Sequence, residues 1–144
     1  MSADSDILAM LDASSVLTVV AEGKTGGINS IYQGFPAVDT TLKVIALPLP
    51  YAVFITSPGY DRDERHSGDV GGRVLEFQLT GVGQSAKQAK FVLDEARKML
   101  NRKRLNGSLI KRAPDNQLAR RDDDYTRVGG LPIFNAFDRY SVAV

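Results

Sequence analysis

The stretch RVLEFQLTGVGQSAKQAKFVLDEARKMLN, residues 73–101, joins a strand pattern directly to a helix pattern. Apolar and polar side chains alternate from Leu75 to Thr80, and a period of two is typical of an antiparallel strand with one buried face. Leu75, Phe77 and Leu79 are the expected buried side of this strand. We expect Gly81 and Gly83 to end it.

The second half of the stretch predicts a helix that extends to Asn101. Ser85 followed three residues later by Gln88 is a capping box, in which each side chain satisfies a backbone N–H of the first turn. An apolar stripe with helical spacing follows: Ala89, Val92, Leu93, Ala96, Met99 and Leu100. Basic residues lie at or just beyond the C-terminal end, where the helix dipole favours cations: Lys98, Arg102, Lys103 and Arg104.

The residues before this stretch indicate a long β-hairpin. YAVFIT, residues 51–56, is aromatic and β-branched and follows the boundary Pro48–Pro50. It is the expected first strand of the hairpin, and the charged segment Ser57–Gly72 is the expected tip.

Shorter elements are predicted on the N-terminal side of the hairpin. A first helix capped by Asp4 or Ser5 is expected to end near residue 13. Val16–Val20 fits either a short helix or a buried strand, because periodicity does not separate the two in a short apolar run. We expect a short strand at Gly27–Gln33 and an irregular connection at Phe35–Pro50.

On the C-terminal side, Leu109–Lys111 and Gln117–Tyr125 are expected to be extended. The last predicted strand runs from about Phe134 to Val144, with Tyr140, Val142 and Val144 on one face. The predicted fold class is α+β: an antiparallel sheet with a long β-hairpin and helices packed on one face.

Composition excludes several classes of protein. With 144 residues the chain suits one domain, and without Cys it has no thiol nucleophile, disulfide or thiolate metal site. The acidic N-terminus is not a signal peptide, and no apolar run reaches the ~18 residues of a membrane span. We therefore expect a soluble intracellular protein with no membrane partner.

The net charge of +1 hides three blocks of opposite sign. Residues 1–96 sum to −5, residues 97–121 to +8 and residues 122–144 to −2. The cations of the middle block can neutralise phosphates, or they can complete a helix C-terminus and meet acidic neighbours. We favour the second interpretation. The block consists of Arg97, Lys98, Arg102, Lys103, Arg104, Lys111, Arg112, Arg120 and Arg121.

Two acidic groups were weighed as metal or catalytic sites. His66 lies among carboxylates in the predicted hairpin tip, but their spacing matches no calcium loop. Asp122 and Asp124 would share one strand face and bind Mg²⁺ only with further ligands. A charged strand end, or inter-subunit salt bridges to Arg120 and Arg121, is therefore favoured. The sequence has no phosphate-binding loop and no nucleophile elbow. We therefore expect no catalytic, cofactor-binding or metal-binding residues, and no enzymatic activity.

The order of these elements resembles that of the tail-terminator, or tail-completion, proteins of long-tailed bacteriophages. Three segments carry the resemblance: Leu49–Phe54, Leu75–Gly81 leading into Ser85–Ala89, and the ending from Asp124–Arg127 through Phe137–Val142. The resemblance implies a single tail-terminator-like domain over residues 1–144, in which helices cover one face of an antiparallel sheet.

The resemblance also implies a structural virion protein. Such a protein forms a ring, expected to be a homohexamer, on the head-proximal end of the tail tube. The ring ends tube polymerisation and provides the joining surface for the neck or head. The implied partners are further copies of the chain, the major tail tube protein and a head-completion or neck protein, with genomic DNA passing through the lumen without specific binding. Assembly would take place in the host cytoplasm.

In such a ring we expect the hairpin tip, Asp61–Asp69, and the basic block to contact neighbouring subunits or the tube. The candidate interface residues are Asp61, Arg62, Asp63, Glu64, Arg65, Arg102, Lys103, Arg104, Arg120 and Arg121. Two alternatives remain open: another head–tail connector or neck adaptor, and a small nucleic-acid-binding module whose DNA retention would be sensitive to salt.

Overall fold

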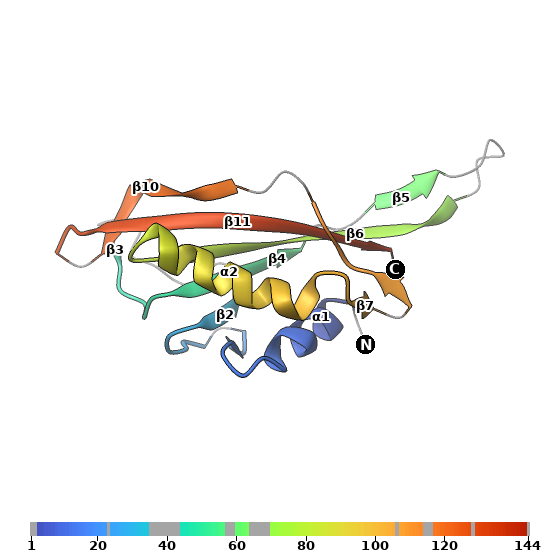
Figure 1. Ribbon diagram of the computed structural model, residues 1–144, viewed down its shortest axis with the longest axis horizontal. Coiled ribbons are helices and arrows are strands. Elements are labelled where there is room, and N and C mark those ends of the chain that lie inside the picture. The colour runs from blue at the N-terminus through green and yellow to red at the C-terminus, as the bar shows by residue number, and fades with distance from the viewer. Residues whose placement is uncertain are drawn as a thin grey trace.

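The computed structural model describes residues 3–22, 24–34, 44–56, 60–63, 70–105, 107–113, 117–127 and 129–143. Two helices lie on the same face of a long, twisted sheet (Figure 1). The helices are α1 (Ala3–Asp12) and α2 (Ala86–Leu100). The strands are β1 (Thr18–Val19), β2 (Ser30–Gln33), β3 (Val44–Ile45), β4 (Tyr51–Thr56), β5 (Tyr60–Asp63), β6 (Val70–Gly83), β7 (Arg104–Leu105), β8 (Ser108–Leu109), β9 (Lys111–Arg112), β10 (Gln117–Arg127) and β11 (Pro132–Ala143). The predicted α+β class is confirmed.

The main sheet has the strand order β1-β2-β4-β6-β11-β10-β3. Its centre is antiparallel: β6 pairs with β4 on one side and with β11 on the other, and Phe77 lies opposite both Thr56 and Tyr140. Pairs nearer the edges are parallel, namely β1–β2, β2–β4 and β10–β3. The sequence pattern did not predict these parallel pairs, because side-chain alternation reports which face is buried and not the direction of the neighbouring strand.

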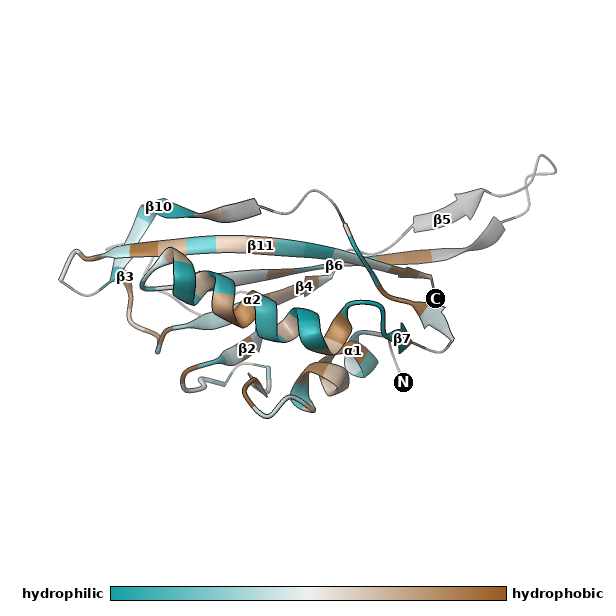
Figure 2. Cartoon of the chain, in the orientation of Figure 1, coloured by the Kyte–Doolittle hydropathy of each residue, from teal (hydrophilic) through white to brown (hydrophobic). Residues whose placement is uncertain are grey.

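The side of the sheet under the helices holds the larger core cluster. The rings of Phe77 and Tyr140 stack there with their centroids 5.1 Å apart. The apolar side of α2 packs on this face while its polar side remains outside, as the hydropathy colours in Figure 2 show. The cluster includes Ile7 and Leu11 of α1, Val92, Leu93, Ala96 and Leu100 of α2, Leu79 of β6, and Ala136 and Val142 of β11.

The opposite side of the sheet holds a second, smaller cluster. Tyr51 and Val53 of β4 and Val82 of β6 point to this side, because they alternate with the residues that face the helices. Ile45 and Leu49, from the segment before β4, cover them. The sheet is therefore buried on both faces in the region of β4.

The predicted hairpin is confirmed, although its strands are longer than expected. β4 occupies the predicted residues 51–56, and its partner β6 begins at Val70, inside the predicted tip. β5 also lies within that tip and pairs with the first residues of β6. The prediction that Gly81 ends the strand was wrong: Gly81 lies inside β6, and Gly83 is its last residue.

Two ambiguous segments are settled by the backbone. Val16–Val20, for which the sequence allowed either a short helix or a strand, contains a strand, because β1 pairs with β2 there. The connection expected to be irregular before Tyr51 contains the two-residue strand β3. Residues 35–43 of that connection lie outside the described part of the chain.

Gly81 and Gly83 allow α2 to lie directly against β6. A Cβ added at Gly81 would collide with the backbone carbonyl oxygen of Ala89 and would come within 3.1 Å of side-chain carbons of Val92 and Leu93. A Cβ at Gly83 would lie 2.6 Å from the backbone nitrogen of Ala89. These glycines therefore form a flat site that accepts the first turns of the helix.

Gly81→Ala tests this close approach. The added methyl group must push α2 away from β6, and overpacking of this kind costs about 1–3 kcal/mol of the free energy of unfolding. Urea denaturation followed by circular dichroism measures the loss. Gly27→Ala is the matched control, because a Cβ at Gly27 would meet no atom within 4 Å. Equal stabilities of the two variants would contradict the packing argument.

Candidate functional site

Two cations of the predicted basic block are bound to one buried carboxylate. Asp138 on β11 is 2% exposed. Its Oδ1 accepts a hydrogen bond of 2.7 Å from Arg112 on β9, and its Oδ2 accepts one of 3.3 Å from Arg97 on α2. A buried charge is tolerated when it is paired and hydrogen-bonded. Asp138 therefore joins α2 and β9 to the sheet, and Arg97 and Arg112 have structural roles.

Sequence reasoning did not single out Asp138. The sequence did contain a signal for it. Asp138 lies two and four residues before Tyr140 and Val142, which were predicted to share one face of the last strand, so its side chain is expected on that same face. A carboxylate at a buried position requires a cation nearby. The sequence alone does not say which cation, because Arg97 and Arg112 are 41 and 26 residues away.

Tyr140 is the aromatic neighbour of this cluster. Its hydroxyl is buried and has no hydrogen-bond partner among the described residues. Burial raises the pKa of the Tyr140 phenol far above its ordinary value, and the negative charge of Asp138 raises it further. Loss of the phenolic proton is therefore disfavoured in the folded state.

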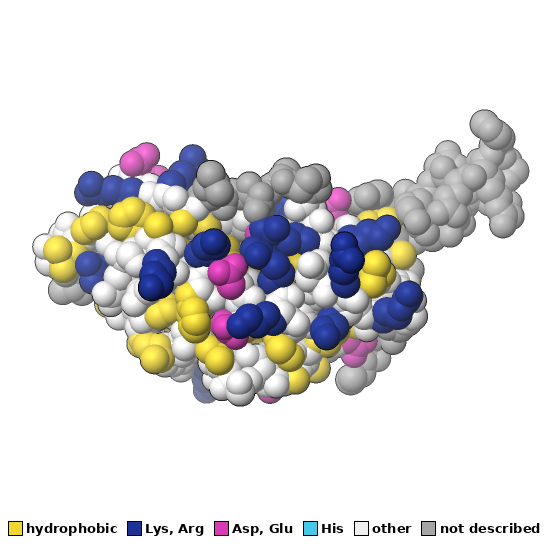
Figure 3. Space-filling model, in the orientation of Figure 1, with side chains coloured by type: hydrophobic (Ala, Val, Ile, Leu, Met, Phe, Trp, Pro, Cys, Tyr) yellow, Lys and Arg dark blue, Asp and Glu magenta, His cyan; other side chains and the backbone are white. Residues whose placement is uncertain are grey.

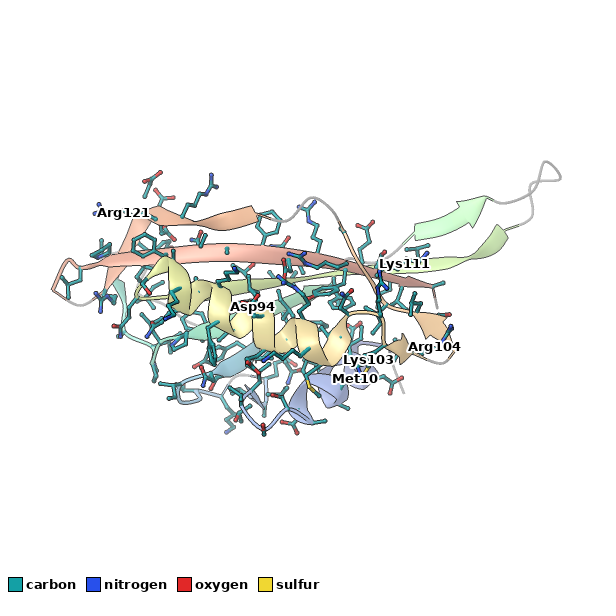
Figure 4. All side chains as sticks on the ribbon, in the orientation of Figure 1. Met10, Asp94, Lys103, Arg104, Lys111 and Arg121 are labelled. Atoms are coloured by element: carbon teal, nitrogen blue, oxygen red, sulfur yellow. The ribbon has the colours of Figure 1, made fainter. Side chains whose placement is uncertain are left out.

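Four other cations form an exposed group at the C-terminal end of α2. We call Arg102, Lys103, Arg104 and Lys111 the basic end. Figure 4 places Lys103, Arg104 and Lys111 at the same end of the molecule, and Figure 3 shows Lys and Arg side chains over this region. Lys98, one turn earlier, is instead paired with Glu95 at 2.9 Å.

The remaining two cations of the block lie elsewhere. Arg120 and Arg121 belong to β10, and Figure 4 places Arg121 at the opposite end of the sheet from Lys103 and Arg104. The nine cations therefore do not form one continuous stripe. The fold divides them into three groups. Arg97, Lys98 and Arg112 pair with carboxylates, the basic end is the second group, and Arg120 and Arg121 on β10 are the third.

The acidic run on β10 stabilises the local backbone. Oδ1 of Asp122 accepts hydrogen bonds from the backbone N–H groups of Asp124 and Tyr125, and its Oδ2 accepts one from Asn135. Asp122 is thus already engaged, but the prediction that it lies at a charged strand end was wrong, because β10 continues to Arg127. Within the described part of the chain, no group of three or more His, Asp or Glu side chains is placed to hold a metal ion.

The hairpin residues proposed for an interface are described only in part. Asp61, Arg62 and Asp63 lie in β5, which pairs with the beginning of β6. Glu64 and Arg65 lie outside the described residues, as does His66. In the structure β5 and the first residues of β6 project beyond the body of the sheet (Figure 1).

Two surface hollows adjoin these charged groups. One, of about 520 Å³, lies along α2, where Arg97 pairs with Asp94 and Lys98 pairs with Glu95. The other, of about 350 Å³, is lined by Lys111 and by residues of β6, β8 and β11. Its described lining contains no carboxylate or imidazole.

None of the helices in the described residues is long and apolar enough to cross a membrane.

Asp138→Asn tests the buried cluster. The substitution removes the negative charge and leaves two arginines partly buried without it, so the free energy of unfolding should fall by about 2–3 kcal/mol. Urea denaturation measures the change. Glu95→Gln, which breaks the exposed pair with Lys98, is the control and should cost less than about 1 kcal/mol. If the two variants lost the same stability, Asp138 would not be the link described here.

Tyr140→Phe tests the orphan hydroxyl. The unfolded chain releases the phenolic proton near pH 10, whereas the folded chain retains it, so Tyr140 lowers the stability of the native protein progressively above that pH. The variant should match the wild type at pH 7 within about 1 kcal/mol and should be the more stable protein in alkaline buffer. Thermal unfolding across the pH range measures the difference, and parallel curves would contradict the assignment.

Comparison with known proteins adds no family to this description. No protein-family model and no curated protein matches the sequence.

Proposed function

We propose that this protein is a structural subunit of the tail-terminator type. It assembles into a ring, six-fold by the resemblance, on the head-proximal end of a bacteriophage tail tube. The ring ends polymerisation of the tube and offers a joining surface to the neck. In this role the chain acts by binding other proteins and needs no catalytic residues.

The observation that carries the proposal is the location of the segments that resemble the family. Leu49–Phe54 enters β4, Leu75–Gly81 lies in β6, and Phe137–Val142 lies in β11. These three strands are adjacent at the centre of the sheet, with Phe54 opposite Leu79 and Phe77 opposite Tyr140. Ser85–Ala89 caps and begins α2, which packs on them. The resemblance therefore concerns mainly the centre of the fold, with Asp124–Arg127 in the adjacent strand β10.

The projecting hairpin provides a second support. Residues 70–73 of β6 pair with β5, whereas the recorded pairing of β6 with β11 begins at Val74. A two-stranded ribbon is only marginally stable by itself in water. Contact with a neighbouring subunit or with the tube would stabilise it. Asp61, Arg62 and Asp63 supply charges of both signs there, which favours a specific partner over general adhesion.

Shortening the hairpin tests this proposal. In the test variant Asn-Gly replaces residues 61–73, so that a two-residue turn joins Tyr60 to its partner Val74. The core lies outside the removed segment, so the thermal unfolding temperature should change little. Ring formation in sedimentation velocity, and arrest of tube growth by the cognate tube protein in electron micrographs, should both be lost.

Lys87→Gln/Lys90→Gln, on the exposed side of α2, is the control and should retain both activities. The proposal fails if the wild-type protein stays monomeric with and without tube protein and never binds tube ends. A wild-type protein that binds the capsid side of the joint instead would identify a neck adaptor.

A further inference from the structure

The basic end carries charge that the described residues do not neutralise. Residues 96–114 contain seven Lys or Arg and no Asp or Glu. Asp138 pairs with Arg97 and Arg112, and Glu95 pairs with Lys98. No carboxylate of the described residues forms an ion pair with the four residues of the basic end. Their mutual repulsion is a cost in the isolated subunit, and an external anion would remove it.

A rigid backbone holds these cations in place. The β7–β8 hairpin follows α2 directly, and its buried Leu105 and the neighbouring Ile110 anchor it on the core. The N–H of Arg102 donates to the carbonyl of Ile110 at 3.1 Å, and the N–H of Ile110 donates to the carbonyl of Lys103 at 2.8 Å. The guanidinium of Arg104 donates to the carbonyl of Gly107 at 2.8 Å. These hydrogen bonds therefore fix the backbone that carries the group, and the Arg104 side chain is held as well.

The backbone of Arg102 is itself unusual. Its φ of 60° lies in the left-handed region, which costs a residue with a side chain about 1 kcal/mol or more. This conformation turns the chain from α2 into β7, so that three consecutive cations leave the helix end on an exposed turn. Glycine would adopt the same turn without this cost.

The chemistry of the group favours phosphate over a protein surface. The cores of protein interfaces are enriched in aromatic residues, Met and Arg and depleted in Lys. The basic end has two Arg and two Lys and no aromatic residue or Met. The exposed large apolar side chains among the described residues are Ile28, Phe91 and Leu131, and none of them belongs to the basic end. Residues 96–114 also contain no aromatic residue. Residues 96–114 therefore offer no aromatic ring on which single-stranded bases could stack, whereas their cations can contact the phosphates of a duplex.

We propose that the basic end binds the phosphate backbone of duplex DNA without reading its base sequence. This assigns Arg102, Lys103, Arg104 and Lys111 to a nucleic acid, where the sequence interpretation favoured acidic protein neighbours. The inference goes beyond the proposed function and does not depend on it, because the contact can be measured without tube protein.

Fluorescence anisotropy with a short labelled duplex of mixed sequence tests the inference. The wild-type protein should bind the duplex at about 50 mM salt and release it by about 200 mM. Lys103→Gln/Arg104→Gln/Lys111→Gln should weaken binding and reduce the slope of log K against log salt by about 2–3, because each lost phosphate contact removes about 0.9. A second duplex of unrelated sequence should give the same curves.

The control variant Lys24→Gln/Lys87→Gln/Lys90→Gln removes the same charge from exposed positions outside the basic end. It should retain most of the binding and the wild-type slope. Lys103→Gln/Lys111→Gln leaves the Arg104 bond to Gly107 intact, and it should still reduce the slope if the triple variant proves unstable. Thermal unfolding identifies any variant that has lost its fold.

Three outcomes would overturn the inference. One is the absence of duplex binding by the wild-type protein at low salt. Another is an equal loss in the test and control variants, which would show that net charge alone drives binding. The third is tighter binding to poly-L-glutamate than to DNA, with the loss in the triple variant confined to poly-L-glutamate. That result would instead assign an acidic protein partner to the basic end.

Discussion

The contact between the backbone of α2 and the backbone of β6 constrains the rest of the molecule. Gly81 and Gly83 leave no Cβ between the strand and the first turns of the helix, so the carbonyl of Ala89 comes close to the sheet. The helix then lies along β6 and β11, with Ala96 and Leu100 fully buried. Because the N-terminal end of α2 is fixed in this way, its C-terminal end carries the basic turn to the opposite end of the sheet (Figure 1).

Sequence reasoning found the elements whose signal is local. The capping box at Ser85, the helical stripe of α2 and the alternation in β6 each depend on residues a few positions apart. The stripe and the alternation are confirmed, and the Ser85 side chain caps α2 as expected. The Gln88 side chain instead accepts from the N–H of Gln84. The role of Gly81 was misjudged because a glycine in a strand pattern indicates either an end or a close approach. Only the position of α2 across the sheet separates these two meanings.

The sequence shows which cations make up the basic block, but it does not show how the fold separates them into different groups. Arg97 and Arg102 look alike in a charge count, yet one lies beside a buried carboxylate and the other projects from an exposed turn. The difference comes from Asp138, which is distant in sequence and enters through the pairing of β9 and β11. Likewise, Arg121 belongs to the basic block in the sequence, whereas β10 places it at the opposite end of the sheet from Lys103 and Arg104 (Figure 4).

The pairing at Asp138 also explains why the basic end can be so highly charged. Arg112 fixes β9 to the sheet and Arg97 fixes the last turns of α2, so both segments that flank the β7–β8 hairpin are held from outside it. Leu105 and Ile110 bury the hairpin against the core, and of the exposed cations Arg104 has a side-chain hydrogen bond within the hairpin, to the carbonyl of Gly107. An exposed surface usually carries charges of mixed sign. The absence of carboxylates among Arg102, Lys103, Arg104 and Lys111 departs from this mixture, and the proposed contact with DNA phosphates would account for it.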